Sequence, residues 1–528
     1  MSFEVRYSDL AARIGQLDTL HGVLETPAFL PVVHPIDQVI RPEFLKDLGF
    51  DAVITNAYIT LKHHKEQAIQ SGIHNLIDFD GIIMTDSGGY QVLEYGDLEI
   101  KPETMAKFQF DIKSDLPVIL DRPTGYRLDY WRAKNFVEET LLNARTTMST
   151  INDKTDHQNQ LAADGRSDIK RPIWVGTIQG AEHLDLVKYS TQELAKIGFD
   201  FFALGSPVEV MEAYDFRLLA KMILTAKELI PNKPLHLFGA GHPLAISLAV
   251  ALGCDTFDSA SYILYARDNR YITPYGTAKL SELTYLPCSC PVCSLHSANE
   301  FRSMDSGTRI IELAKHNLHI LKMEINILKQ VITDGRLWEY VVQKARSHPK
   351  LMEALAYIKD HPIMESGTKR FKSKAAFFFD SIDYYRPEAR QYREMIARFR
   401  SCKSRVLFYP EQDIKPFYTS NRYADLIKEY QGFQICSYNA FLGIIPVELC
   451  DIYPAAHNLS NQADHADEAT EYSYDETIKS LKAFVNFNHF EEIVIYANHA
   501  VRNSLNRNQL NHSNVTILEY DNDRNKLA

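Results

Sequence analysis

Eight short apolar runs recur between residues 29 and 260, and segments with the period of an amphipathic helix separate them. Apolar strands without polar alternation are typical of a parallel sheet that is covered on both faces. Eight strand and helix units therefore predict an α/β fold of the (β/α)8 barrel type, with a doubly wound open sheet as the alternative. The open sheet is less favoured because no G-x-G-x-x-G turn follows an early strand. The runs read FLPVV, DAVITNA, GIIMTDS, LPVILD, PIWVGTIQG, DFFALGS, PLHLFGAG and CDTFDSA.

Polar residues and glycines stand at the C-terminal ends of six of these runs. In a barrel those ends meet at one mouth, where barrel enzymes hold their chemistry. Each aspartate alone is better explained as a helix cap or a turn residue. Six such positions together favour a single active site that draws on six strands. The positions are Asp86, Asp121, Gln179, Gly205, the turn 239–241 and Asp258.

Three cysteines lie close together at Cys288, Cys290 and Cys293, and His316 follows in a segment of helical period. Three thiolates and one imidazole are a frequent ligand set for tetrahedral structural zinc. A redox C-x2-C motif is less favoured because it would carry two cysteines and no distant histidine. Since the protein would fill all four positions, we expect the zinc to be structural and not to activate water.

The net charge of −11 argues against binding a polyanion through overall charge, so a nucleic-acid surface would have to be a local patch. No apolar run reaches the roughly 18 residues that a membrane span needs, and the N-terminus lacks the features of a signal peptide. The seven cysteines do not have the spacing of a disulfide framework. We therefore expect a cytoplasmic protein.

The length of the chain allows several domains. We expect a catalytic barrel at residues 1–360, with a zinc subdomain at about residues 280–320. Residues 150–170 are polar and lack periodicity, which predicts a surface insertion. Beyond residue 361, strand-like runs such as VLFYP and EEIVIYA alternate with helical segments, so residues 361–528 are expected to form small α/β accessory modules.

Several motifs stand in a fixed order along the first 320 residues. They are TDSGGYQ (85–91), LDRPT (120–124), IQG (178–180), LHLFGAGHP (235–243), FDSASYILYAR (257–267) and PCSCPVC with KHNL. Together they resemble the archaeosine-type tRNA-guanine transglycosylases of archaea. The resemblance implies a (β/α)8 barrel with a zinc subdomain near its last strand. It also implies exchange of guanine 15 in the tRNA D-arm for preQ0, 7-cyano-7-deazaguanine, through a covalent aspartyl-tRNA intermediate.

The resemblance also assigns roles to residues at matching positions. Asp258 would be the nucleophile at the ribose C1′, and Asp86 the general acid and base, much as in retaining glycosidases. Asp121 would accept hydrogen bonds from the N1 and 2-amino groups of the base, and Gln179 would bind its carbonyl side. The other residues implied for the base pocket are Tyr90, which would stack on the base, and Ser87, Gly205 and Ser206. Those implied for tRNA contacts are Arg267 and Arg270.

The chain departs from the archaeal pattern in two places. After the sixth predicted strand, Gly205, Ser206 and Pro207 stand where a Gly-Gly-Val-like loop is typical. Archaeal relatives also end in a PUA RNA-binding domain, which residues 361–528 do not resemble. We therefore expect tRNA and preQ0 as ligands, a homodimer, and a PUA function that is either missing or supplied by a separate protein.

Two alternatives stay open. A queuine or preQ1-type enzyme would exchange guanine at the anticodon, although LHLFGAGHP and the long C-terminal extension favour the archaeal type. A tRNA-binding subunit without catalytic activity would need neither Asp86 nor Asp258, so the presence of both disfavours it.

Overall fold

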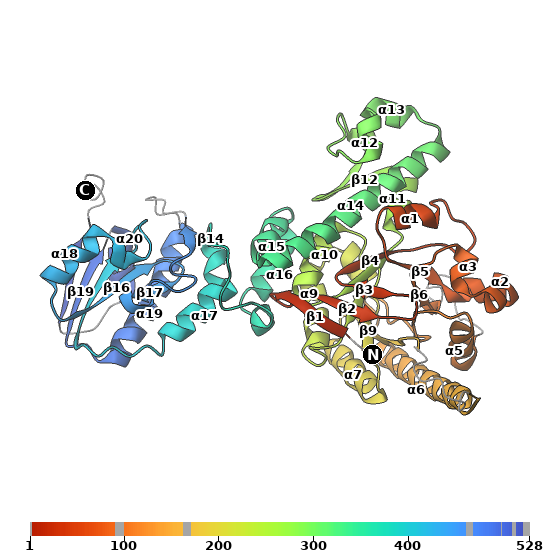
Figure 1. Ribbon diagram of the computed structural model, residues 1–528, viewed down its shortest axis with the longest axis horizontal. Helices are drawn as coiled ribbons and strands as arrows, with labels where there is room; N and C mark the ends of the chain where they lie inside the picture. Colours follow the sequence, from red (N-terminus) through yellow and green to blue (C-terminus); the bar gives the residue numbers. More distant parts are fainter. Residues whose placement is uncertain are drawn as a thin grey trace. The chain divides into compact units, whose positions relative to one another are not determined.

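The computed structural model describes residues 3–89, 100–161, 171–460, 468–497, 499–508 and 514–520. The chain divides into two compact units, Met1–Gly367 and Thr368–Ala528, and both mix helices with strands (Figure 1). Among the helices of the described residues, none combines the length and the apolar composition that spanning a bilayer requires.

Eight parallel strands form a closed barrel in the first unit. The strands are β4 (Ala28–Pro31), β5 (Ala52–Asn56), β6 (Ile82–Asp86), β7 (Leu116–Pro117), β8 (Val175–Ile178), β9 (Phe201–Leu204), β10 (Leu235–Leu237) and β11 (Thr256–Ser259). Ladders join them in the orders β4-β11-β10-β9-β8 and β5-β6-β7. Parallel bridges from Val32 to Ile54 and from Val118 to Val175 close the two remaining gaps. The predicted (β/α)8 barrel is confirmed, and each apolar run corresponds to one strand.

Helices connect the strands and cover the barrel. They are α1 (Pro42–Asp47), α2 (Ala57–Ser71), α3 (Ile73–Ile77), α5 (Pro102–Asp111), α6 (Tyr130–Leu161), α7 (Leu184–Ile197), α8 (Val208–Glu212), α9 (Phe216–Lys227) and α10 (Pro243–Ala251). All nine residues of α10 are buried, because this helix lies between the barrel and two further helices of the unit, α14 (Ser306–Asp334) and α15 (Leu337–Ala345). Its uniformly apolar sequence has no polar face for that reason.

Helix α6 corrects one expectation from the sequence. Residues 150–161 were predicted to belong to a surface insertion, but they continue this helix as far as Leu161. A helix that is polar all round shows no apolar period, so the pattern alone could not reveal it. Residues 162–170 lie outside the described residues.

An antiparallel sheet that the sequence analysis did not predict packs at the start of the chain. Its strands are β1 (Phe3–Asp9), β2 (Ala12–Asp18) and β3 (Val23–Glu25). The turn between β2 and β3 reaches the N-terminal end of the barrel, where the N–H groups of His21 and Ile83 donate to the buried Asp115 carboxylate at 2.8 and 2.9 Å. The His74 ring lies 3.0 Å from the same carboxylate. These contacts lower the Asp115 pKa although its burial acts in the opposite direction.

The predicted zinc subdomain follows the last barrel strand. It starts with α11 (Ser261–Arg267) and a hairpin of β12 (Arg270–Thr273) and β13 (Gly276–Lys279). The short helices α12 (Pro291–Leu295) and α13 (Ala298–Ser303) come next, and α14 runs back to the barrel (Figure 1). Helices α15 and α16 (Pro349–Ile358) complete the unit.

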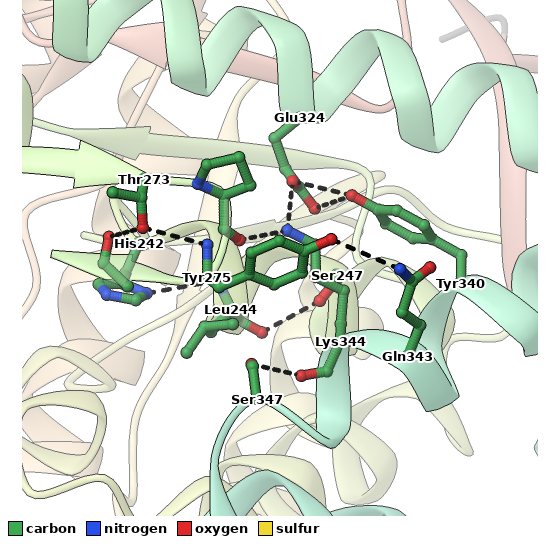
Figure 2. A network of polar contacts seen from close by, with 12 residues as sticks. His242, Leu244, Ser247, Thr273, Tyr275, Glu324, Tyr340, Gln343, Lys344 and Ser347 are labelled. Carbon is green, nitrogen blue, oxygen red and sulfur yellow. Dashed lines mark hydrogen bonds and ion pairs between the residues drawn. The ribbon is translucent and has the colours of Figure 1, made fainter. Parts of the chain in front are cut away.

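A buried ion pair holds the hairpin against α14 and α15. Lys344 Nζ donates to Glu324 Oε2 at 2.7 Å and to the Pro274 carbonyl at 2.5 Å. The Tyr340 hydroxyl donates to the same carboxylate at 2.9 Å, and Figure 2 shows these side chains converging on Glu324. Since Pro274 lies in the turn between β12 and β13, this network fixes the hairpin that begins the zinc subdomain.

Replacing Lys344 with alanine is expected to destabilise the protein by about 3 to 5 kcal/mol, because Glu324 would stay buried without its partner. The measurement is the free energy of unfolding in urea. Lys350→Ala is the matched control, since Lys350 forms an exposed pair with Glu353 and its loss is expected to cost less than about 0.5 kcal/mol. Equal effects of the two variants would contradict the structural role of Lys344.

The second unit is built on one five-stranded mixed sheet in the order β17-β16-β15-β19-β20. Its strands are β15 (Arg405–Pro410), β16 (Phe433–Asn439), β17 (Gly443–Pro446), β19 (Glu492–Ala497) and β20 (Val515–Glu519). A two-stranded sheet of β14 (Ala376–Phe378) and β18 (Asn458–Ser460) accompanies it. The helices are α17 (Pro387–Ile396), α18 (Asn421–Glu429), α19 (Glu468–Asn488) and α20 (His499–Asn508). This α/β fold agrees with the class predicted for the C-terminal part.

Candidate active site

Asp258 lies on β11 at the mouth of the barrel, and two neighbours orient its carboxylate. The Gly239 N–H donates to Asp258 Oδ1 at 2.9 Å, and His236 Nε2 lies 3.0 Å from the same oxygen. An ionised carboxylate only accepts hydrogen bonds, so Nε2 carries the ring proton. His236 Nδ1 then accepts from the Thr256 hydroxyl at 2.9 Å. The side chains of both His236 and Asp258 are buried.

Asp86 ends strand β6, and two strands, β4 and β5, separate β6 from the strand β11 that carries Asp258. Asn56 stands beside it at the end of β5 and donates from Nδ2 to Asp86 Oδ2 at 3.0 Å. Burial raises the pKa of Asp86 to about 7, and the nearby charges of Asp121 and Asp258 act in the same direction. Near neutral pH this carboxyl can therefore either donate or accept a proton, as an acid-base group must.

Asp121 and Gln179 form a hydrogen-bonded pair at the ends of β7 and β8. Gln179 Nε2 donates to Asp121 Oδ2 at 2.6 Å. Its Oε1 accepts from the Thr124 N–H at 3.1 Å and from the Ser206 hydroxyl at 3.0 Å. Burial raises the pKa of Asp121 to about 6, although the Gln179 contact opposes this shift. The structure thus brings Asp121, Gln179 and Ser206 together, and Ser206 orients the amide.

Two glycines permit this close packing. A Cβ on Gly89 would lie 2.2 Å from Asp121 Oδ1, and one on Gly205 would lie 2.4 Å from Gln179 Nε2. Neither distance is compatible with a side chain, so these positions require glycine. Ser87 is fully buried and donates to the Ile119 carbonyl at 2.8 Å, which makes it a support of the turn beside Asp86. Tyr90, predicted to stack on the base, lies outside the described residues.

The four predicted metal ligands converge in the zinc subdomain. The sulfur atoms of Cys288, Cys290 and Cys293 and one ring nitrogen of His316 all lie within 4.8 Å of one another, so the group can hold a metal ion. His316 Nδ1 faces the thiols, at 3.3 Å from Cys293 Sγ. Its Nε2 lies 2.9 Å from the Ile272 carbonyl on β12 and therefore carries the proton. This backbone contact fixes the tautomer in which Nδ1 is free to bind a metal.

A family model described as queuine tRNA-ribosyltransferase matches residues 9–350. The chain belongs to this family. Among its relatives are proteins named tRNA-guanine(15) transglycosylase from three archaea. That of Methanocaldococcus jannaschii is 37% identical over 94% of this chain and 74% of its own length. The protein of Archaeoglobus fulgidus is 37% identical over 91% of this chain and 92% of its own length. That of Saccharolobus solfataricus is 38% identical over 93% of this chain and 96% of its own length.

Members of the queuine tRNA-ribosyltransferase family are pentosyltransferases that act on tRNA, so this chain is an enzyme of that class. The two arginines predicted to contact tRNA lie at the start of the zinc subdomain, on α11 and β12. Arg267 pairs with Asp37 at 3.2 Å and Arg270 with Asp268 at 2.7 Å. Both pairs are exposed, and such pairs are weak enough for a phosphate to replace the carboxylate.

Sequence reasoning missed two residues of this candidate site. His236 and Asn56 hold Asp258 and Asp86, but neither was singled out as a candidate. The signal in the sequence was faint: His236 is a single imidazole inside the apolar run PLHLF, and Asn56 follows the strand DAVIT. Burying an imidazole without a hydrogen bond costs free energy, so a histidine in a buried strand is expected to have a hydrogen-bond partner. This expectation could have pointed to His236.

Proposed function

We propose that this protein exchanges guanine 15 in the D-arm of tRNA for preQ0 through a covalent bond between Asp258 and the ribose. The observation that carries the proposal is the fixed orientation of the Asp258 carboxylate at the same barrel mouth as Asp86, whose pKa the charge of Asp258 helps to raise. Among the described residues, the contacts from His236 and Gly239 are both made to Oδ1, and we assign Oδ2 to the attack. The names of the archaeal relatives support the position of the target base.

In the first half of the reaction, Asp258 Oδ2 forms a bond to the ribose C1′ and the bond from C1′ to guanine N9 breaks. Asp86 donates its proton to the departing guanine, because its raised pKa keeps part of it protonated near neutral pH. The tRNA backbone stays intact. The target base must leave its stack to reach the mouth of a barrel, so base extrusion precedes the attack.

In the second half, preQ0 takes the place of guanine. Its N9 loses a proton to the ionised Asp86 and attacks C1′, which releases the Asp258 carboxylate. Enclosure of the ester by the base pocket keeps water from hydrolysing it. The chemistry is symmetrical, so one pair of carboxyls serves both the departing and the incoming base.

Asp121 and Gln179 are the residues that we assign to base recognition. A carboxylate accepts from both the N1–H and the 2-amino group, and the Gln179 amide N–H donates to the carbonyl oxygen of the base. These groups now bond to each other at 2.6 Å, so the base must separate them as it enters. The hydroxyls of Ser206 and Thr124 donate to Gln179 Oε1 and would hold the amide in place while its Nε2 changes partner from Asp121 to the base.

The proposed function is tested by incorporation of radiolabelled guanine into two tRNA transcripts, one without guanine 15 and one without guanine at the first anticodon position. We expect the first transcript to be inactive and the second to be a full substrate. The opposite pattern would show the anticodon type of enzyme, and inactivity with both would contradict exchange. Addition of unlabelled preQ0 is expected to release the label.

We assign zinc to the group of three cysteines and His316, with one ion per chain in a structural role. Three thiolates and an imidazole suit tetrahedral zinc and leave no position for a water. When bound, zinc would join the loop that carries the cysteines to α14, while the Ile272 carbonyl orients the histidine. We place the reaction in the cytoplasm, where tRNA is found; the homodimer and the separate PUA-domain protein stay predictions.

Replacing His316 with alanine is expected to lower the zinc content from about one ion per chain to less than half of that. Elemental analysis of the purified protein gives the content. His319→Ala is the control, because His319 lies one turn further along α14 and does not belong to the cysteine group. Zinc content that stays at the wild-type level in His316→Ala would remove His316 from the site.

A further inference from the structure

The loop between β7 and α6 contacts Gln179 and Ser206, two of the residues that we assign to the base pocket. Thr124 contacts Gln179 through both its N–H and its hydroxyl. Further along, the Tyr126 N–H donates to Glu209 on α8 at 2.5 Å, and His183 Nε2 donates to the Leu128 carbonyl at 2.8 Å. The N-terminal end of α6, which follows this loop, therefore lies at the rim of the mouth.

An aromatic pair occupies the first turn of α6. The Tyr130 hydroxyl donates to Asp185 at 2.8 Å, and its ring packs edge-on against His183 at 5.4 Å between centroids. Trp131 packs edge-on against Tyr130, also at 5.4 Å, yet 70% of its surface is exposed. Tryptophan is highly buried on average, so an exposed indole that lies with a second aromatic ring and a cation at the rim of the mouth is a candidate binding contact.

Cations accompany these rings. Lys134 Nζ lies 5.8 Å from the centre of the Trp131 ring, and the Arg127 guanidinium lies 5.1 Å from that of Tyr126. Residues 122–134 hold four basic residues and one acidic residue, in a chain whose net charge is −11. This stretch of the chain is therefore positively charged and carries exposed aromatic rings, while Asp185 and Glu209 from neighbouring elements lie against it.

We infer that this rim, made of Arg127, Tyr130, Trp131, Arg132 and Lys134 and here called the α6 rim, stacks an unpaired nucleotide next to the extruded guanine of the tRNA substrate. The inference rests on the proposed function and adds the surface that receives the nucleotide next to the target. Proteins bind unpaired bases by stacking them on aromatic rings, while nearby cations meet the phosphates. The Trp131 indole offers the stacking face, with Lys134 against its ring and with Arg127 and Arg132 close by in the chain.

Tryptophan fluorescence tests the contact directly. The chain has three tryptophans, and Trp174 and Trp338 are 8% and 1% exposed, so Trp131 is the one that a ligand on the surface can reach. Titrating the inactive Asp258→Asn enzyme with tRNA is expected to quench the emission. The same titration of Asp258→Asn combined with Trp131→Phe is expected to show no comparable quenching. Equal quenching in both proteins would overturn the inference.

Kinetics supply the second readout. Trp131→Ala is expected to raise the KM for tRNA about tenfold, while the KM for guanine stays the same. Trp131→Phe should restore most of the loss. Leu142→Ala is the matched control, because Leu142 is also exposed on α6 but lies about 16 Å further along the helix. A KM for tRNA within twofold of wild type in Trp131→Ala would overturn the inference.

An abasic nucleotide beside guanine 15 identifies the stacked partner. For the wild-type enzyme, the KM for the abasic tRNA is expected to be higher than the KM for normal tRNA. For Trp131→Ala, the two KM values should be equal, because this variant has already lost the stacking contact. If Trp131→Ala instead dissociates an oligomer and leaves the KM for tRNA unchanged, the α6 rim binds protein and the inference is wrong. Failure of the proposed function is distinguishable, since it would abolish exchange by the wild-type enzyme.

Discussion

Replacing Asp258 with asparagine is expected to lower the rate of guanine exchange by about 10,000-fold or more and to abolish the covalent adduct with tRNA. An amide has no negative charge with which to attack C1′. Its carbonyl oxygen can still accept the contacts from His236 and Gly239, so the fold and the tRNA affinity should be preserved. The loss is thus expected in the chemical step alone.

The adduct is measured by mixing enzyme with labelled tRNA, denaturing the mixture and separating protein-bound from free label. His236→Asn is a useful comparison, because it keeps the nucleophile and disturbs its orientation. We expect this variant to form the adduct more slowly than wild type, with the KM for guanine unchanged. An adduct that persists in Asp258→Asn would show that another residue attacks the ribose.

The barrel could be predicted from the sequence because its strands are buried on both faces and are therefore apolar without interruption. The ends of the apolar runs also predicted the position of the barrel mouth, because Asp86 and Asp258 lie at the C-terminal ends of two of them. The group of four metal-ligating side chains could be predicted because three closely spaced thiols and a histidine on a helix are a frequent ligand set. In each case burial or ligand chemistry left a pattern of residue types that is visible in the sequence.

The residues that support the two proposed catalytic carboxyls left no such pattern. Asn56 precedes Asp86 by 30 residues, and His236 precedes Asp258 by 22, so each pair meets only because neighbouring strands are in register. The role of Ser206 also depended on the structure: its φ of 57° lies in the left-handed region, and its hydroxyl points at the Gln179 amide. From the sequence it had only been placed in the base pocket.

The final prediction concerns Asp86, whose replacement with asparagine is expected to slow adduct formation by about 1,000-fold. In wild type the single-turnover rate should fall as pH rises above about 7, because burial and the charges of Asp121 and Asp258 raise the Asp86 pKa to that value and the acid form is lost above it. The slope should approach tenfold per pH unit, and Asp86→Asn should lack it.

Two neighbours allow the origin of this pH dependence to be examined at saturating tRNA. Asn56 donates to the ionised form of Asp86 and lowers its pKa, so Asn56→Ala is expected to shift the fall in rate to higher pH. Asp121 raises the Asp86 pKa through its charge, so Asp121→Asn is expected to shift the fall to lower pH. Shifts in opposite directions would identify Asp86 as the titrating acid, because both neighbours act on it. A fall in rate that neither variant moves would assign the proton to a different group.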